Sequence, residues 1–171
     1  MFKNIANFNN TSDYLPLLTA VLITDLFVIL LSNTRVIKSK VLNQWYSQYN
    51  LSAVVADVLI ILIGLIITRV LYYNIFNEFS IIQFVLLAVV IQIVHDVLFY
   101  VFFTNVPRGI NKMMDTFKDY ADEVSYKAIL SDSGMMAMSS IIASYLASKD
   151  LNTNMIVMII SVYLLPYILY N

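Results

Sequence analysis

Five stretches of apolar residues, separated by shorter polar segments, dominate the pattern of the chain. They cover residues 14–32, 53–73, 79–104, 134–148 and 153–170. A helix rises about 1.5 Å per residue, so it needs about 20 residues to cross the roughly 30 Å hydrocarbon core of a bilayer. The stretch 134–148 is the shortest, and a re-entrant helix is the alternative for it. The pattern predicts an all-α fold, a polytopic membrane helix bundle with about five transmembrane helices.

Two further segments, 33–51 and 110–130, have apolar residues at helical spacing and polar residues between them. The apolar positions of the first include Trp45 and Tyr49, residue types that prefer the headgroup level of a membrane. The second keeps charges on the opposite face, but its basic and acidic residues balance, so it has little attraction for anionic lipid. We expect both segments to be amphipathic interfacial helices.

The composition supports a membrane protein and removes several classes of function. The chain is 60% hydrophobic and 12% charged, against about 45–50% and about 25% in soluble domains. We therefore expect a single integral membrane domain over residues 1–171. Its net charge of −1 gives no reason to expect nucleic-acid binding, and the absence of cysteine excludes disulfides and thiolate metal sites.

The basic residues of the loops predict an orientation. With five crossings, one side of the membrane carries seven of them: Arg35, Lys38, Lys40, Arg108, Lys112, Lys118 and Lys127. The other side has Lys3 and Lys149, and also Arg69 if its side chain snorkels out of the second span. Because cytoplasmic loops are enriched in Lys and Arg, we expect the N-terminus outside and the C-terminus in the cytoplasm.

Four ionisable side chains fall at a similar depth inside the predicted spans. Counted at about 1.5 Å per residue from the cytoplasmic side, Asp57, Asp25, Asp96 and His95 lie about 8, 10, 12 and 14 Å deep. Gln92 lies one turn before His95 and Asp96 and extends their polar face. A charge within the bilayer is costly unless it faces protein or water, so we expect these groups to form one intramembrane polar cluster.

Two interpretations of this polar cluster are open. In the first, it handles protons or cations, because intramembrane ionisable groups often line pathways and histidine titrates near neutral pH. In the second, the same groups bond to one another, to helix ends, or to Arg35 and Arg108 as charge partners, and simply fix how the helices pack.

The sequence gives no sign of an enzyme. It contains one histidine, no HExxH motif, and no paired nucleophile and base, and the potassium-channel filter sequence is also absent. We therefore expect no catalytic residues, no cofactor and no metal ion. A membrane-embedded enzyme acting through His95 is the least favoured alternative.

The stretch Ile91 to Lys112, with Val94-His95-Asp96-Val97-Leu98-Phe99-Tyr100 and Pro107-Arg108-Gly109, is followed by the helix MMDTFKDYADEV. In these residues the chain resembles small multi-span membrane proteins of nucleocytoplasmic large DNA viruses. The similarity runs from about Ala53 to Tyr170. The resemblance implies a protein of the internal virion membrane beneath a capsid, and it implies no catalytic residues.

Two functions follow from these observations. The first is a non-enzymatic structural component of a large DNA virus internal membrane. Segments 33–51 and 110–130 would then contact capsid proteins or neighbouring copies in a homo-oligomer. The alternative is a small proton- or cation-linked transporter or channel that uses Asp25, Asp57, His95 and Asp96.

Overall fold

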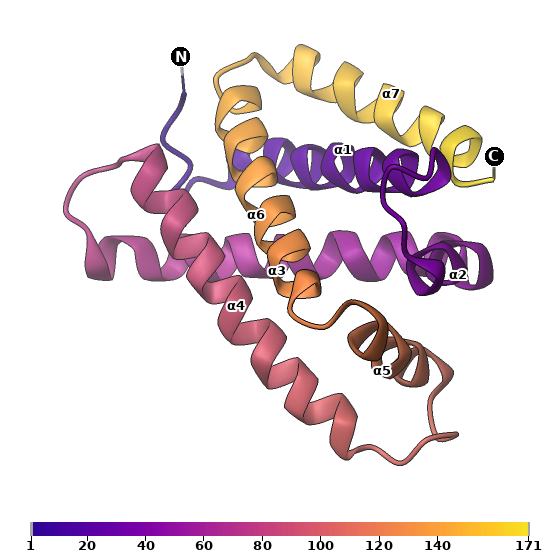
Figure 1. The fold of residues 1–171 in the computed structure, drawn as a ribbon. Coiled ribbons are helices and arrows are strands. Elements are labelled where there is room, and N and C mark those ends of the chain that lie inside the picture. Colours follow the sequence, from indigo (N-terminus) through magenta and orange to yellow (C-terminus); the bar gives the residue numbers. More distant parts are fainter. Residues whose placement is uncertain (1, 171) are drawn as a thin grey trace.

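The computed structural model describes residues 2–170 and is built from α-helices, which confirms the all-α prediction. A short 3-10 turn, Thr11–Asp13, precedes the first helix. Over the described residues the helices are α1 (Tyr14–Asn33), α2 (Lys40–Tyr49), α3 (Leu51–Ile75), α4 (Ile81–Asn105), α5 (Lys112–Val124), α6 (Lys127–Leu146) and α7 (Leu151–Leu169). Figure 1 shows α1, α3 and α7 running in nearly parallel lines, with α4 and α6 side by side and oblique to them.

The core lies between α1 and α6. Helix α6 packs against both α1 and α4, and α1 packs in addition against α3 and α7. The inner face of α6 is made of small residues, including the buried Ser139, Ser140 and Ala143, which allow a close approach of helix backbones. The Ser139 hydroxyl donates a hydrogen bond of 3.0 Å to Thr24 Oγ1 on α1. This contact satisfies a polar group that would be costly in an apolar core.

Four helical segments are long and apolar enough to cross a membrane: Thr11–Asn33, Leu51–Ile75, Ile81–Asn105 and Leu151–Leu169. They support an integral membrane protein built as a helix bundle. The expected number of about five is not reached, since α6 is not among them. The physical reason is its polar content, because it carries Lys127, Asp132 and several serines.

The bundle has two ends with different contents. At one end the segment before α1 meets the ends of α6 and α3: the amide of Lys3 donates to Ser144 O, and Asn4 Nδ2 donates to the Tyr73 hydroxyl. At the opposite end α1 finishes beside α7, and Asn33 Nδ2 donates to Ile168 O at 2.7 Å. Helices α2 and α5 also lie at this second end (Figure 1).

The two amphipathic segments differ from the prediction in their bounds. In segment 33–51 only α2 is a separate helix, and the chain before it turns sharply at Arg35, whose φ is +60°. Segment 110–130 is divided at Ser125, whose φ is +53°. The helix expected over 134–148 therefore begins at Lys127, and Asp132 lies inside it.

The apolar faces of α2 and α5 pack on each other. Trp45 and Phe117 have ring centroids 4.9 Å apart, and the Tyr49 hydroxyl lies 2.9 Å from Thr116 Oγ1. The apolar stripes of α2 and α5, which predicted contact with a membrane surface, thus pack on each other. Nothing in the sequence distinguishes these two kinds of apolar neighbour.

Glu123 of α5 caps the start of α2. Its carboxylate accepts hydrogen bonds from the Ser39 hydroxyl at 2.8 Å and from the backbone amides of Lys40 at 2.8 Å and Val41 at 2.9 Å. Desolvation opposes ionisation, but these three donors outweigh it and lower the pKa of Glu123. A carboxylate at this position also interacts favourably with the helix dipole.

Replacing Glu123 with Gln should destabilise the protein by about 1 kcal/mol, a value kept low because the side chain is exposed to solvent screening. Because the folded-state pKa is lowered, this stabilisation is complete above the unfolded pKa and is lost as the pH falls through the folded value. The measurement is thermal unfolding in detergent at pH 7 and pH 4. Glu78→Gln, which changes an exposed loop glutamate, is the matched control, and an equal loss in both variants would contradict the capping role.

The Arg69 side chain, for which snorkelling out of the second span was one option, stays inside the protein. Its side chain is fully buried, and its Nη2 donates to the backbone oxygens of Asn7 at 2.5 Å and Asn10 at 2.9 Å. The guanidinium lies 4.8 Å from the centre of the Tyr14 ring, and Asp13 Oδ2 is 3.8 Å away. The segment before α1 folds over the end of α3 and supplies acceptors where water was expected.

Candidate functional site

A cavity of about 590 Å³ lies between α2, α3, α4, α5 and α6. We call it the acidic cavity, because three carboxylates from three different helices line it: Asp57 on α3, Asp96 on α4 and Asp132 on α6. His95 and Gln92 line it as well. The remaining wall is mainly aromatic and aliphatic, so the carboxylates face a largely apolar space.

Two carboxylates are held by side chains of α2. Trp45 Nε1 donates to Asp57 Oδ2 at 2.9 Å. The Tyr46 hydroxyl donates to Asp25 Oδ1 at 3.0 Å. Asp25 is fully buried on α1 and lies behind the Tyr46 wall of the cavity rather than in it, and its Oδ2 makes no hydrogen bond within the described residues.

The polar residues of α4 form one connected group. Gln92 Nε2 donates to Asp96 Oδ1 at 2.7 Å, and His95 Nδ1 lies 3.2 Å from the same oxygen. Asp96 Oδ2 is buried and has no protein partner in the part of the chain described. One oxygen of Asp96 is therefore fixed by its neighbours on α4, while the other is enclosed by protein.

Aromatic rings make a continuous wall beside these carboxylates. His95 stacks on Phe99 with centroids 5.6 Å apart, Phe99 meets Phe117 edge-on at 5.2 Å, and Phe117 lies 4.9 Å from Trp45. The rings come from α4, α5 and α2, so this wall exists only when the three helices are packed together.

Two tyrosines on α2 and α5 contribute hydroxyl groups. Burial raises the pKa of the Tyr120 phenol, and the nearby charges of Asp132 and Asp57 raise it further. Burial likewise raises the pKa of Tyr46, with Asp57 and Asp25 adding to the effect. Both phenols therefore stay protonated at neutral pH, and the Tyr46 hydroxyl donates to Asp25.

The acidic cavity reaches the surface between α4 and the junction of α5 with α6. Its lining includes Val97 and Tyr100, which are about half exposed, and Tyr126, which is 65% exposed. The opening lies toward the end of the bundle that holds α2 and α5.

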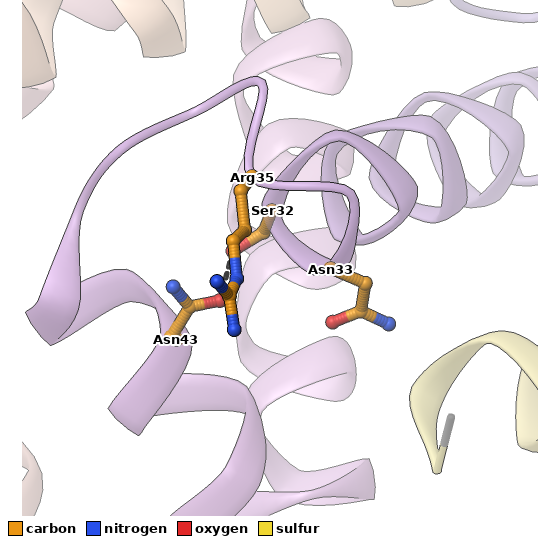
Figure 2. Close-up of a pocket in the computed structure, with 4 residues that line it drawn as sticks. All are labelled: Ser32, Asn33, Arg35 and Asn43. Carbon is orange, nitrogen blue, oxygen red and sulfur yellow. Dashed lines mark hydrogen bonds between the residues drawn. The ribbon is translucent and has the colours of Figure 1, made fainter.

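The two arginines expected as charge partners lie elsewhere. Arg108 forms ion pairs with Asp119 at 2.7 Å and Asp122 at 3.7 Å, all exposed on or near α5. Arg35 lines a separate polar pocket at the junction of α1 with α2, together with Ser32, Asn33 and Asn43 (Figure 2). Ser32 donates there to Asn43 Oδ1 at 2.8 Å.

The structure therefore brings together four of the five predicted cluster residues, Asp57, Gln92, His95 and Asp96, and leaves Asp25 behind the wall. Sequence reasoning missed Asp132, which the sequence Ser-Asp-Ser presents as a helix cap. One signal could have found it: Ala128, Asp132 and Met135 continue at helical spacing into the apolar stripe.

Across residues 2–170 no three His, Asp or Glu side chains converge in a way that would hold a metal ion. Compared with protein-family models, with curated proteins and with solved structures, the chain matches none of them.

Proposed function

We propose that the protein is a small membrane transporter that binds a cation in the acidic cavity and exchanges it for protons. The single observation that carries this proposal is the convergence of Asp57, Asp96 and Asp132 from three helices on one open, mainly apolar space. Like charges that share a low-dielectric site compete for protons, so binding of a cation there favours release of a proton.

The titratable groups at the site come from every helix around it, and the two phenols among them stay protonated at neutral pH. The titratable groups are Asp25 on α1, Tyr46 on α2, Asp57 on α3, His95 and Asp96 on α4, Tyr120 on α5 and Asp132 on α6. His95 is the only basic side chain in this set. The arrangement can therefore neutralise a cation with carboxylates.

The proposal includes five crossings, with α6 as the fifth. Its serines face α1 and α4 rather than lipid, so a helix of moderate hydropathy is tolerated in this position. The end of the bundle with α2 and α5 would lie in the cytoplasm, together with the C-terminal end of α7. The larger number of basic residues in its loops supports this orientation.

Proteoliposomes that contain a pH-sensitive dye test the proposal. With an acidic interior, addition of external Na⁺, K⁺ or organic ammonium salts should raise the internal pH faster than in empty liposomes. Asp96→Asn and Asp57→Asn should each slow the exchange about tenfold or more, because each removes one of the three carboxylates that line the cavity.

Asp122→Asn is the matched control, since it removes an exposed carboxylate of α5 outside the cavity, and it should exchange at the wild-type rate. Wild-type vesicles that behave like empty liposomes with every cation would refute transport. Equal losses in Asp122→Asn and Asp96→Asn would refute the assignment of the site.

The structural role in the internal membrane of a large DNA virus is the second candidate. It is favoured by the position of α2 and α5 at one end of the bundle, where α5 presents exposed charges such as Asp119 and Asp122 to a neighbouring protein. Its test is cross-linking in purified virus particles, where capsid proteins or other copies of the chain should be captured through α5. Absence of the chain from purified particles would refute this role.

A further inference from the structure

We propose that the cation taken by the acidic cavity is an organic ammonium ion with an aromatic or bulky apolar group, rather than a bare inorganic ion. The inference rests on the proposed function and names its substrate class. It comes from the size of the cavity, the chemistry of its wall and the position of its opening.

The size of the cavity favours an organic ligand. A cavity of about 590 Å³ falls within the roughly 300–1,000 Å³ of pockets that enclose drug-sized molecules. An inorganic ion needs several oxygen ligands at close and even distances. Among the described residues no three carboxylate or imidazole groups are placed to hold a metal ion, and Asp57 and Asp96 each already have one oxygen committed to protein donors.

The chemistry of the wall is the second argument. An ammonium group binds to the faces of aromatic rings and to carboxylates, and the first interaction strengthens when water is excluded. Phe99, Phe117 and Trp45 form a continuous wall on one side of the cavity. The Asp96 side chain lines the cavity and is 13% exposed, so its carboxylate supplies negative charge beside the rings. One organic cation can use both features at once.

The position of the cavity opening favours an amphiphilic ligand. The opening is bordered by Val97, Tyr100 and Tyr126, beside the apolar surface of α4 that would face lipid. An amphiphilic cation concentrates at the interface between lipid and water, and so it meets this opening directly. A strongly hydrated ion does not share that advantage.

The chain contains its own probe for the test. Trp45 is the only tryptophan and lines the cavity, so its fluorescence should change when a ligand binds. The detergent-solubilised full chain would be titrated with benzyltrimethylammonium and with neopentylbenzene, its uncharged analogue of nearly the same shape. We expect the cation to bind at least about tenfold more tightly, because only the cation gains the ion pair and ring interactions.

Two variants assign the contacts. Asp132→Asn removes one charge while keeping shape, and Phe99→Leu removes one ring. Each should weaken benzyltrimethylammonium binding several-fold and leave neopentylbenzene binding less affected. Asp122→Asn should bind both compounds as the wild type does.

The outcomes separate this inference from the proposed function. Equal affinity for the charged and uncharged compounds would overturn the inference, as would proton exchange in liposomes driven by Na⁺ or K⁺ but not by benzyltrimethylammonium. Tight, charge-selective binding without proton exchange would support the ligand class while refuting transport. Charge-selective binding with exchange would support both.

Discussion

Arg69→Met should destabilise the protein by about 3 kcal/mol, the lower end of the range for breaking a buried charge pair. The substitution keeps much of the side-chain volume but removes the donor to Asn7 O and Asn10 O. It also leaves Asp13, which is fully buried, with Lys3 as its remaining cation at 2.8 Å. The measurement is equilibrium unfolding in mixed micelles, followed by Trp45 fluorescence.

Arg108→Met is the control for this prediction. Arg108 and its partner Asp119 are each about half exposed, and exposed pairs contribute about 0–1 kcal/mol. A loss in Arg69→Met no larger than that in Arg108→Met would show that the buried guanidinium does not hold the N-terminal segment on α3.

Gly64→Val should destabilise the protein by about 1–3 kcal/mol, the usual cost of overpacking. A Cβ atom at this position would lie 2.5 Å from Met136 Cε on α6 and 3.6 Å from Gln92 Oε1 on α4. The flexible end of Met136 can move away from a single methyl group, but Met136 is fully buried and has little space for two more. The unfolding of detergent-solubilised variants measures this cost.

The double variant Gly64→Val with Met136→Ala should recover part of the loss, with a favourable coupling of at least about 0.5 kcal/mol. Gly134→Val is the matched control, because no atom lies within 4 Å of a Cβ added there. If Gly134→Val costs as much as Gly64→Val, helix propensity rather than packing of α3 on α6 explains the result.

The long apolar runs were sufficient to predict the main helices. Their hydrophobicity is a local property, so α1, α3, α4 and α7 lie close to the spans read from the sequence. The polar residues of α4 could also be found, since Gln92 and Asp96 are one turn apart and bond within their own helix.

The boundary between α5 and α6, and the way α2 and α5 cover the cavity, depend on tertiary contacts that the sequence does not reveal. Ser125 divides α5 from α6 with a positive φ that a serine rarely adopts, and no glycine or proline marks the break. The apolar stripes of α2 and α5 could have faced lipid equally well. Since these two helices cover the cavity, its volume and aromatic wall could not be derived from periodicity.

The burial of Arg69 could not be predicted for a different reason. Its position near the end of a span made water the nearest expected partner. The carbonyl groups of Asn7 and Asn10 reach it instead, and they belong to a segment without periodicity. The positions of backbone oxygens in irregular segments cannot be predicted from the pattern of residue types.

The burial of α1 between helices from the end of the chain has a consequence for biogenesis. Asp25 accepts its hydrogen bond from Tyr46 of α2, and Thr24 accepts one from Ser139 of α6, so a nascent α1 enters the bilayer without these two contacts. Ser139 becomes available only after more than half of the chain has been synthesised. Assembly of this bundle therefore has high contact order. Helix α1 reaches its final packing only after α6 and α7 have been synthesised.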